Sequence, residues 1–162
     1  ITVSYFNPSF RLNPLNSPKL SQLKDRELLY RVLLVSETVG ATGRTAASIA
    51  AILGVAEYNN RRDHVGAVLL FHEGQAAQML EGARVDLDRL IERQSRDGRH
   101  SGLRVVDDRP ISHRRLTEPM RLNRLSADAA AERLAGRRLD ELSAPELESL
   151  LCCDELRASR AA

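Results

Sequence analysis

Apolar and polar positions between residues 28 and 122 follow strand and helix periods in turn, around a central hairpin. Residues 65–72 are apolar or β-branched on both faces, as in a strand that is covered on both sides. Glu73-Gly74 is a two-residue connection, with glycine where a tight hairpin needs positive φ. Residues 75–80 are therefore expected to return as the second strand of the hairpin.

The returning strand carries a polar residue in an apolar row. Ala76, Gln78 and Leu80 share one face, because side chains alternate along a strand. A buried amide without hydrogen-bond partners costs on the order of 1–3 kcal/mol. Gln78 is therefore expected to meet backbone, water or a ligand inside the fold.

The rest of this region continues the alternation of strands and helices. Ile49, Ile52, Leu53 and Ala56 recur at the spacing of an amphipathic helix face. The further predicted elements are strands at 28–36, 103–108 and 113–122, with Pro119 placing the last at an edge, and helices at 45–58 and 83–97. The order βαββαββ predicts an α+β, ferredoxin-like sheet with both helices on one face.

The two ends of the chain read differently from the middle. Residues 1–27 contain three prolines and no sustained period, which predicts an irregular N-terminal arm, with 1–6 able to add as an edge strand. We expect the folded domain to span 28–123 and a helical extension to span 124–162. In that extension Ser126 can cap a first helix, and Ser143-Ala144-Pro145-Glu146 forms a capping box for a second.

Composition narrows the classes of partner. The 24 basic and 22 acidic residues nearly balance, and aromatic residues make up only 4% with no Trp, so neither nucleic acid nor an anionic membrane is indicated. Cys152 and Cys153 are adjacent and have neither disulfide nor metal-site spacing, which fits a reducing cytoplasm. No apolar run approaches the roughly 20 residues of a membrane span. We also find no nucleophile–base arrangement, and predict that the chain is not an enzyme.

Several segments occur in the order and spacing of one known family. They are LYRVLLVS at 29–36, NNRR at 59–62, QMLEG at 78–82, RDGRHSGLRVV at 96–106, RPISHRR at 109–115, and Met120. Through them the chain resembles the BLUF domains, which are flavin-binding blue-light sensors, over residues 28–122. The resemblance implies an FAD held between the two helices, with the edge of its ring facing the sheet.

The resemblance also implies which residues surround the cofactor. The family's amide pair falls on Asn59 and Asn60, with Asn60 at the pyrimidine edge of the flavin, and its switching glutamine falls on Gln78. Arg62 is expected near the phosphates. The implied cofactor-binding residues are Asn59, Asn60, Gln78, Arg62, Ile52, Arg99, His100 and Met120. For some of these residues a purely structural role stays open. Asn59 and Asn60 could end the helix, Gln78 could be a core amide with its hydrogen bonds satisfied, and Arg99-His100 could form a solvated turn.

The chain departs from the family at the photoactive centre. The tyrosine that donates to the excited flavin in photoactive members falls on Leu34, which has neither redox chemistry nor a hydroxyl. The tryptophan often found before the last-strand methionine is absent, and Ala56 replaces a small hydroxyl residue. The usual photocycle between tyrosine and glutamine is therefore not expected here.

Three functions remain open from the sequence. The first is a BLUF-type FAD-binding sensory domain that signals by protein contact, either within a homo-oligomer such as a dimer or with a separate effector protein. The second is a flavin-free, degenerate BLUF-like interaction module. The third is a small ferredoxin-like hydrolase, although residues 39–43 are too weakly glycine-rich to indicate a phosphate-cradling loop.

Overall fold

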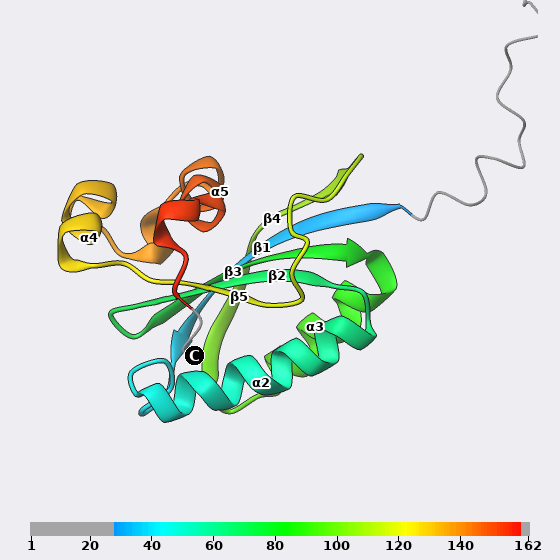
Figure 1. The fold of residues 1–162 in the computed structure, drawn as a ribbon, viewed down its shortest axis with the longest axis horizontal. Coiled ribbons are helices and arrows are strands. Elements are labelled where there is room, and N and C mark those ends of the chain that lie inside the picture. The colour runs from blue at the N-terminus through cyan, green and yellow to red at the C-terminus, as the bar shows by residue number, and fades with distance from the viewer. Residues whose placement is uncertain (1–27, 160–162) are drawn as a thin grey trace, which may run out of the picture.

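The computed structural model describes residues 28–159, which form a five-stranded sheet with helices on both faces (Figure 1). The predicted N-terminal arm, 1–27, lies outside the described residues. In chain order the elements are β1 (Leu29–Thr38), α2 (Ala46–Arg62), β2 (Gly66–His72), β3 (Gln75–Ala83), α3 (Arg84–Ser95), β4 (His100–Ile111), β5 (Arg121–Asn123), α4 (Ala127–Leu134) and α5 (Ala144–Cys152). Short 3-10 helices at Leu139–Glu141 and Asp154–Leu156 complete the chain.

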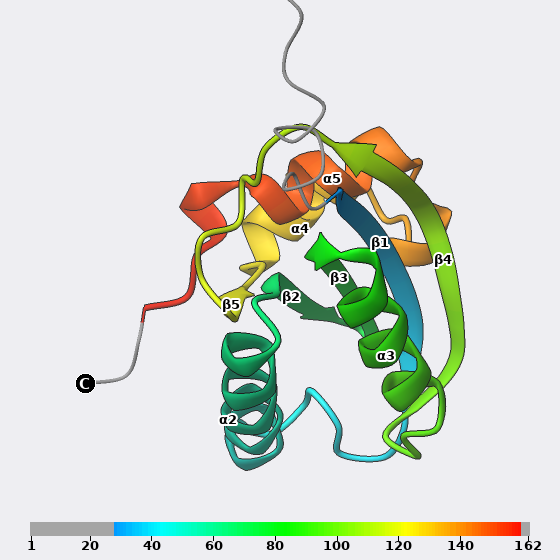
Figure 2. The same cartoon turned by 90° about the vertical axis from the view of Figure 1, so that its right-hand side faces the viewer.

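The sheet has the strand order β4-β1-β3-β2-β5. The first four strands pair antiparallel, and β5 runs parallel to β2. Figure 2 shows α2 and α3 together on one face of the sheet and the C-terminal helices on the other. The predicted ferredoxin-like α+β fold, with two helices on one face, is confirmed.

Several boundaries differ from the sequence prediction; the strand expected at 103–108, for example, spans His100–Ile111. Two further differences affect the candidate site. The strand expected at 113–122 is only three residues long, because Pro119 lacks an N–H and the preceding segment leaves the sheet. Helix α2 continues to Arg62 rather than ending near Tyr58. Asn59 and Asn60 therefore lie in its last turn, and Asp63 caps it with an N–H bond to the Asn59 carbonyl.

Side-chain alternation along the central strands builds a separate core on each face. On β1, Val32 and Leu34 belong to the core beneath α2 and α3, whereas Leu33 and Val35 belong to the core beneath the C-terminal helices. The second core is completed by Leu134, Leu139, Leu147, Leu150 and Leu151. The extension that was predicted as helical thus buries the second face of the sheet.

Local capping explains where the C-terminal helices begin. The Ser126 hydroxyl accepts from the Ala129 N–H, and the Glu146 carboxylate accepts from the Ser143 N–H at 2.9 Å. These are the two caps that the sequence predicts. Each satisfies backbone N–H groups that have no partner inside the helix.

A buried ionic network fastens the extension to the sheet. Glu81 on β3 is fully buried, and its Oε1 atom accepts from Arg31 Nε at 2.7 Å. Its Oε2 atom accepts from the backbone N–H groups of Arg115 and Leu116 at 2.7 and 2.8 Å. Arg31 also donates to Glu148 of α5 at 2.7 Å. Both oxygens of the buried carboxylate are therefore satisfied, as a buried charge requires.

Glu81→Ala should lower the free energy of unfolding by about 3–5 kcal/mol, because it leaves Arg31 and two N–H groups short of partners. Urea denaturation at neutral pH measures the change. As a matched control, Glu92→Ala removes a carboxylate that is 62% exposed and pairs with Arg96, and should cost less than about 1 kcal/mol. Equal losses in the two variants would contradict a structural role for the network.

Candidate functional site

A cavity of about 220 Å³ opens between α2 and α3, above the face of the sheet that carries Gln78. Helix α2 contributes residues at the spacing 52, 55, 56, 59 and 60, which is one face of a helix. Strand β3 contributes Gln78 and Leu80, which share a face. The full lining is Ile52, Val55, Ala56, Asn59, Asn60, Gln78, Leu80, Leu90, Arg93, Gln94, Asp97, Arg99, His100 and Met120.

The cavity gathers most of the residues that the sequence singles out as cofactor-binding. Those in its lining are Asn59, Asn60, Gln78, Ile52, Arg99, His100 and Met120. They come from α2, β3, the turn after α3, the start of β4 and the segment before β5, so the fold brings distant parts of the chain to one place. Arg62 is not in the lining and instead bonds to its neighbour Asp63 at 2.8 Å. The contact of each residue with a cofactor stays a prediction.

Gln78 has one satisfied end and one free end. Its side chain is 7% exposed, and its Oε1 atom accepts from Nε2 of Gln94 on α3 at 2.9 Å. Its own Nε2 atom has no hydrogen-bond partner within residues 28–159. On the neighbouring strand Leu34 stands opposite Gln78, 1% exposed, and offers no polar atom. The floor of the cavity thus holds an unused amide donor.

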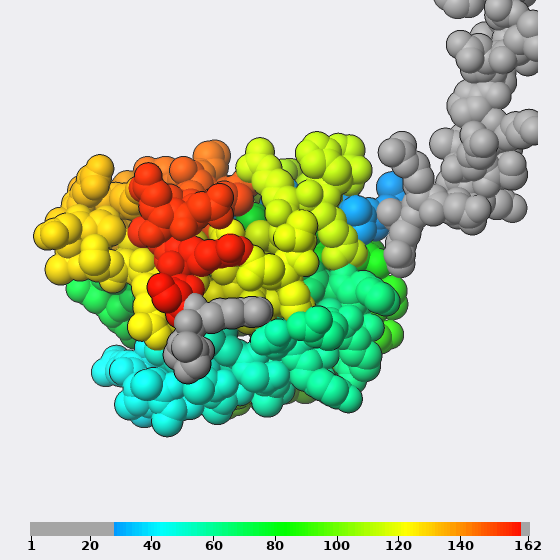
Figure 3. Space-filling view, viewed as in Figure 1, coloured from blue at the N-terminus to red at the C-terminus, as the bar shows by residue number. Residues whose placement is uncertain are grey.

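The two asparagines of α2 play different structural parts. Asn60 is 3% exposed, and its Nδ2 atom donates to the Pro119 carbonyl at 2.8 Å. This bond joins the last turn of α2 to the yellow-green segment that Figure 3 shows running above the helix. The side chain of Asn59 makes no hydrogen bond within the described chain, and it lines the cavity. Because α2 continues past both residues, neither is its stop residue.

Carboxylates neutralise the guanidinium groups at the rim. Asp63 accepts from Arg62 of α2 and, at 3.3 Å, from Arg93 of α3. The hydrogen bond from Arg62, together with the weaker one from Arg93, lowers the pKa of Asp63 to about 2. One carboxylate therefore links the ends of the two helices that flank the cavity, and it occupies arginines that an anionic ligand would use.

The turn after α3 repeats this arrangement. Arg99 donates to Asp97 with Nη2 at 2.6 Å and Nε at 3.0 Å, and these bonds hold the pKa of Asp97 below its usual range. His100 lies within 3.1 Å of the Ser36 hydroxyl through Nδ1. Burial lowers the pKa of His100, which favours the neutral ring at neutral pH.

Sequence reasoning missed the part of the lining that α3 supplies. Arg93, Gln94 and Asp97 follow Leu90 at spacings of three, four and seven residues, so all four lie on one side of the helix and its continuation. The same spacing identified the apolar face of α2, and could have indicated these residues as well. They were left out because polar residues on a surface helix normally face solvent.

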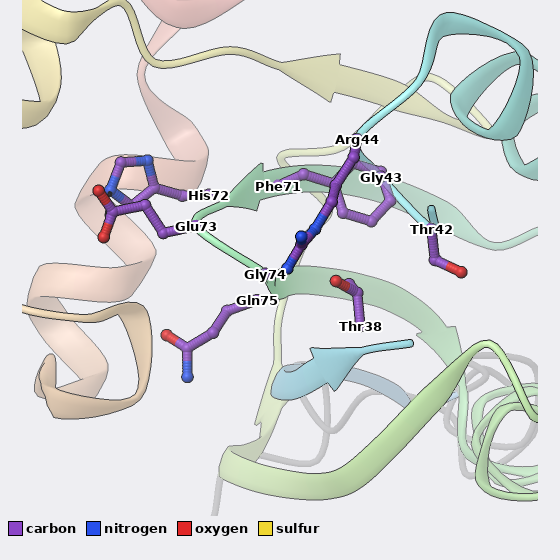
Figure 4. Close-up of a pocket in the computed structure, with 9 residues that line it drawn as sticks. All are labelled: Thr38, Thr42, Gly43, Arg44, Phe71, His72, Glu73, Gly74 and Gln75. Carbon is purple, nitrogen blue, oxygen red and sulfur yellow. Dashed lines mark ion pairs between the residues drawn. The ribbon is translucent and has the colours of Figure 1, made fainter. Parts of the chain in front are cut away.

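A second cavity, of about 440 Å³, lies at the tip of the β2–β3 hairpin (Figure 4). The loop before α2 closes over it, and Gly43 is required there because a Cβ atom would lie 2.3 Å from the Phe71 ring. Figure 4 shows Gln75 and His72 turned away from Arg44, so its polar groups do not converge. Gln75 bonds instead to Glu37 and to the Leu139 N–H. The smaller cavity between the helices is therefore the candidate site.

Residues 28–159 lack two further features, a membrane-spanning helix and a cluster of metal ligands. None of the helices there is long and apolar enough to cross a membrane. Within the same residues, no three His, Cys, Asp or Glu side chains gather as metal ligands.

Comparison with protein-family models decides the identity. The model of the BLUF family, described as sensors of blue-light using FAD, matches residues 29–120. The chain belongs to the BLUF family. The resemblance read from the sequence is confirmed, and with it the class of flavin-binding blue-light sensor domains. BLUF domains are sensory modules and not enzymes, so the prediction of a non-enzyme holds and the hydrolase alternative falls.

Solved structures agree with this assignment. BlrB, a BLUF protein in its dark state, is 26% identical with a TM-score of 0.62, over 78% of this chain and 93% of that one. BlsA in its photo-activated state shares the fold, with a TM-score of 0.69 at 19% identity, over 79% and 94% of the chains. A bacterial light-regulated adenylyl cyclase is 25% identical with a TM-score of 0.58, over 64% of this chain. The BLUF chain spans about a third (31%) of that cyclase. A search of curated protein sequences returned no match.

The ion pairs of Asp63 should make the free energy of unfolding depend on pH in the acid range. A carboxyl whose pKa is lowered on folding stabilises the fold above its unfolded pKa of 3.8, and this contribution is lost as pH falls toward about 2. Asp63→Asn should cost about 1 kcal/mol at pH 7, allowing for solvent screening, and the difference from the parent should shrink between pH 4 and 2. Urea denaturation across this range measures it.

A double-mutant cycle with Arg62→Gln supplies the control. In the Asp63→Asn background, Arg62→Gln should change the pH dependence no further, because its carboxylate partner is already gone. A pH-independent difference between Asp63→Asn and the parent would contradict the assigned cause.

Proposed function

We propose that this BLUF domain holds the ring system of FAD between α2 and α3, and regulates another protein chain by contact, without the usual photocycle. The observation that carries the proposal is the convergence of four side-chain amides, at Asn59, Asn60, Gln78 and Gln94, on one slot with apolar walls. A flat heterocycle with alternating donors and acceptors along its edge matches such a set of amides.

The size and walls of the slot support a ring and not a whole dinucleotide. Its volume of about 220 Å³ is below the roughly 300–1,000 Å³ of typical ligand sites. Ile52, Leu80, Leu90 and Met120 supply apolar walls. The rest of FAD would then extend past the rim, where Arg93 and Arg99 lie. A bound flavin supplies blue-light absorption and one- or two-electron chemistry, and the chain supplies the slot and the hydrogen bonds.

The absence of an aromatic donor at the slot supports the loss of the photocycle. Leu34 faces Gln78 across the β1–β3 pair. Tyr30 lies four residues earlier on β1, roughly 13 Å away along the strand, and stacks against the Arg84 guanidinium. Tyr58 is exposed on α2. In the described part of the chain, neither tyrosine lines the slot.

The arrangement of β3 supports signalling through the C-terminal helices. Gln78 lies on the flavin face of this strand, while Glu81, three residues on, lies on the opposite face. Through Arg31, Glu81 is connected to Glu148 of α5. The outer surfaces of α4 and α5 are therefore the proposed contact for a second copy or a separate effector protein.

One specific observation favours the alternative of a flavin-free interaction module. The arginines that an FAD diphosphate would use are already paired, Arg93 with Asp63 and Arg99 with Asp97. In that case the slot would be a remnant, and the C-terminal helices alone would carry the function.

FAD titration separates these two functions. Purified protein should bind FAD, and Asn59→Ala should weaken binding about tenfold, as expected for one lost hydrogen bond. Asn59 suits this test because its side chain has no partner within the described fold whose loss would unfold it. Tyr58→Ala, at a neighbouring exposed position outside the slot, is the control and should leave affinity unchanged. No binding of FAD or FMN by calorimetry would favour the flavin-free module.

Illumination tests the role of Leu34. The flavin-loaded parent should show no reversible red shift of its absorption under blue light, whereas Leu34→Tyr should show one, because a donor then stands opposite Gln78. Leu34→Phe is the matched control, since it adds the ring without the hydroxyl. Both substitutions enlarge a buried side chain, and should lower the free energy of unfolding by about 1–3 kcal/mol. A red shift in the parent would refute the proposed loss of the photocycle.

A further inference from the structure

Gln94 is a slot residue for which neither the family match nor the sequence pattern provides a role. It lies near the end of α3, half-buried, and its Nε2 atom donates to Oε1 of Gln78 at 2.9 Å. Its own Oε1 atom is buried and has no hydrogen-bond partner within residues 28–159. A buried acceptor without a partner is costly, and such groups in native proteins call for an explanation.

We propose that Gln94 is the positioning residue that fixes the orientation of the Gln78 carboxamide, an inference that rests on the proposed flavin site. With its oxygen held by Gln94, Gln78 can present only its NH₂ group to the slot. The ligand must then offer a hydrogen-bond acceptor, such as a flavin carbonyl, at that point. Gln94 thereby decides which edge of a heterocycle the slot accepts.

The surroundings of Gln78 leave this task to Gln94. In the strand register Gln78 stands between Leu34 on β1 and Leu69 on β2, and neither has a polar side-chain atom. An amide group is nearly the same shape in its two orientations, so packing alone discriminates weakly between them. The hydrogen bond from Gln94 is the one polar side-chain contact to Gln78 in the described chain, and it requires the oxygen on that side.

The unpartnered oxygen of Gln94 adds a second requirement. It lies in the same carboxamide as the nitrogen that donates to Gln78, so the free donor of Gln78 and the free acceptor of Gln94 belong to one bonded pair. A ligand with an acceptor beside an N–H group satisfies both. A carbonyl next to a ring N–H, as in the pyrimidine portion of a flavin, has this pattern.

Two substitutions of similar size test the orientation. Gln94→Glu replaces the donor with a carboxylate that only accepts, so Gln78 should turn its NH₂ group toward position 94 and its oxygen toward the slot. Gln94→Leu removes the partner and should leave both orientations populated. Because the free protein is measured first, this test does not depend on bound flavin.

In the flavin-free protein, the side-chain NH₂ signals of Gln78 report the orientation by NMR, with Gln78→Leu providing their assignment. Gln94→Glu should move these proton signals downfield, because the NH₂ group then donates to a carboxylate. Identical Gln78 signals in the parent, Gln94→Glu and Gln94→Leu would overturn the proposal. Should Gln94→Glu fail to fold, the comparison of the parent with Gln94→Leu decides by the same criterion.

Flavin-loaded protein gives an independent measurement. Gln94→Glu should weaken FAD binding about tenfold and raise the carbonyl stretching frequency of the bound flavin, because the donor is withdrawn. In the Gln78→Leu background, Gln94→Glu should leave the carbonyl stretching frequency unchanged, since Gln94 affects that carbonyl through Gln78. Equal frequencies and affinities in the parent and Gln94→Glu would overturn the positioning role while leaving the flavin site intact. Altered NMR signals in a protein that binds no flavin would support the positioning role and overturn the flavin site.

Discussion

The constraint on which the structure depends is the complete burial of β3. All nine residues from Gln75 to Ala83 are buried, because helices cover both faces of the strand and β1 and β2 cover its edges. Each polar side chain on it must therefore be satisfied from another element. Gln75 bonds to Glu37 and the Leu139 N–H, and Glu81 bonds to Arg31 and two backbone N–H groups. Gln78 is half satisfied, and the proposed flavin slot lies on this side of β3.

Sequence periodicity and turn chemistry predicted the parts of the fold that depend on local rules. The hairpin at Glu73-Gly74, the caps at Ser126 and Ser143, and the apolar face that places Gln78 among Ala76 and Leu80 all follow from turn chemistry and alternation. The hydrogen-bond partners of the buried polar side chains did not follow from these rules. Gln94 contacts Gln78 only because α3 packs on that face of the sheet, and the spacing along α3 places Gln94 on the side of Leu90 without indicating its partner. A polar residue on a helix that lines a slot looks, in sequence, like one that faces water.

In the proposed flavin site, the ion pairs at the rim leave most of the recognition to the flavin ring. Asp63 and Asp97 each occupy an arginine that could otherwise meet a diphosphate, and both carboxyls have lowered pKa values, so they stay ionised through the neutral range. The guanidinium groups of Arg93 and Arg99 are 40% and 45% exposed, so solvent screens these pairs, although the Asp63 carboxylate is only 7% exposed. A phosphate can therefore exchange with them without gaining much free energy. Affinity must then come from apolar contact in the slot and from the amides, which makes the orientation of Gln78 more consequential.

The buried network around Glu81 limits how a change at Gln78 can reach the rest of the chain. Sliding β3 along its neighbours would break the bonds of Glu81 to Arg31, Arg115 and Leu116, which are buried and expensive to lose. Gln94 is joined to Gln78 by one hydrogen bond, and the Pro119 segment is held by the Asn60 bond together with the contacts of Glu118 to the Ala67 N–H and to Arg157. None of these contacts involves a fully buried charge, so they resist movement less than the bonds of Glu81 do. That segment leads into β5 and then into α4. For the proposed function, a signal that leaves β3 in place thus has a second route to the helices on the opposite face, through Asn60 and residues 119–126, beside the contacts of Glu81 and Arg31 with α5.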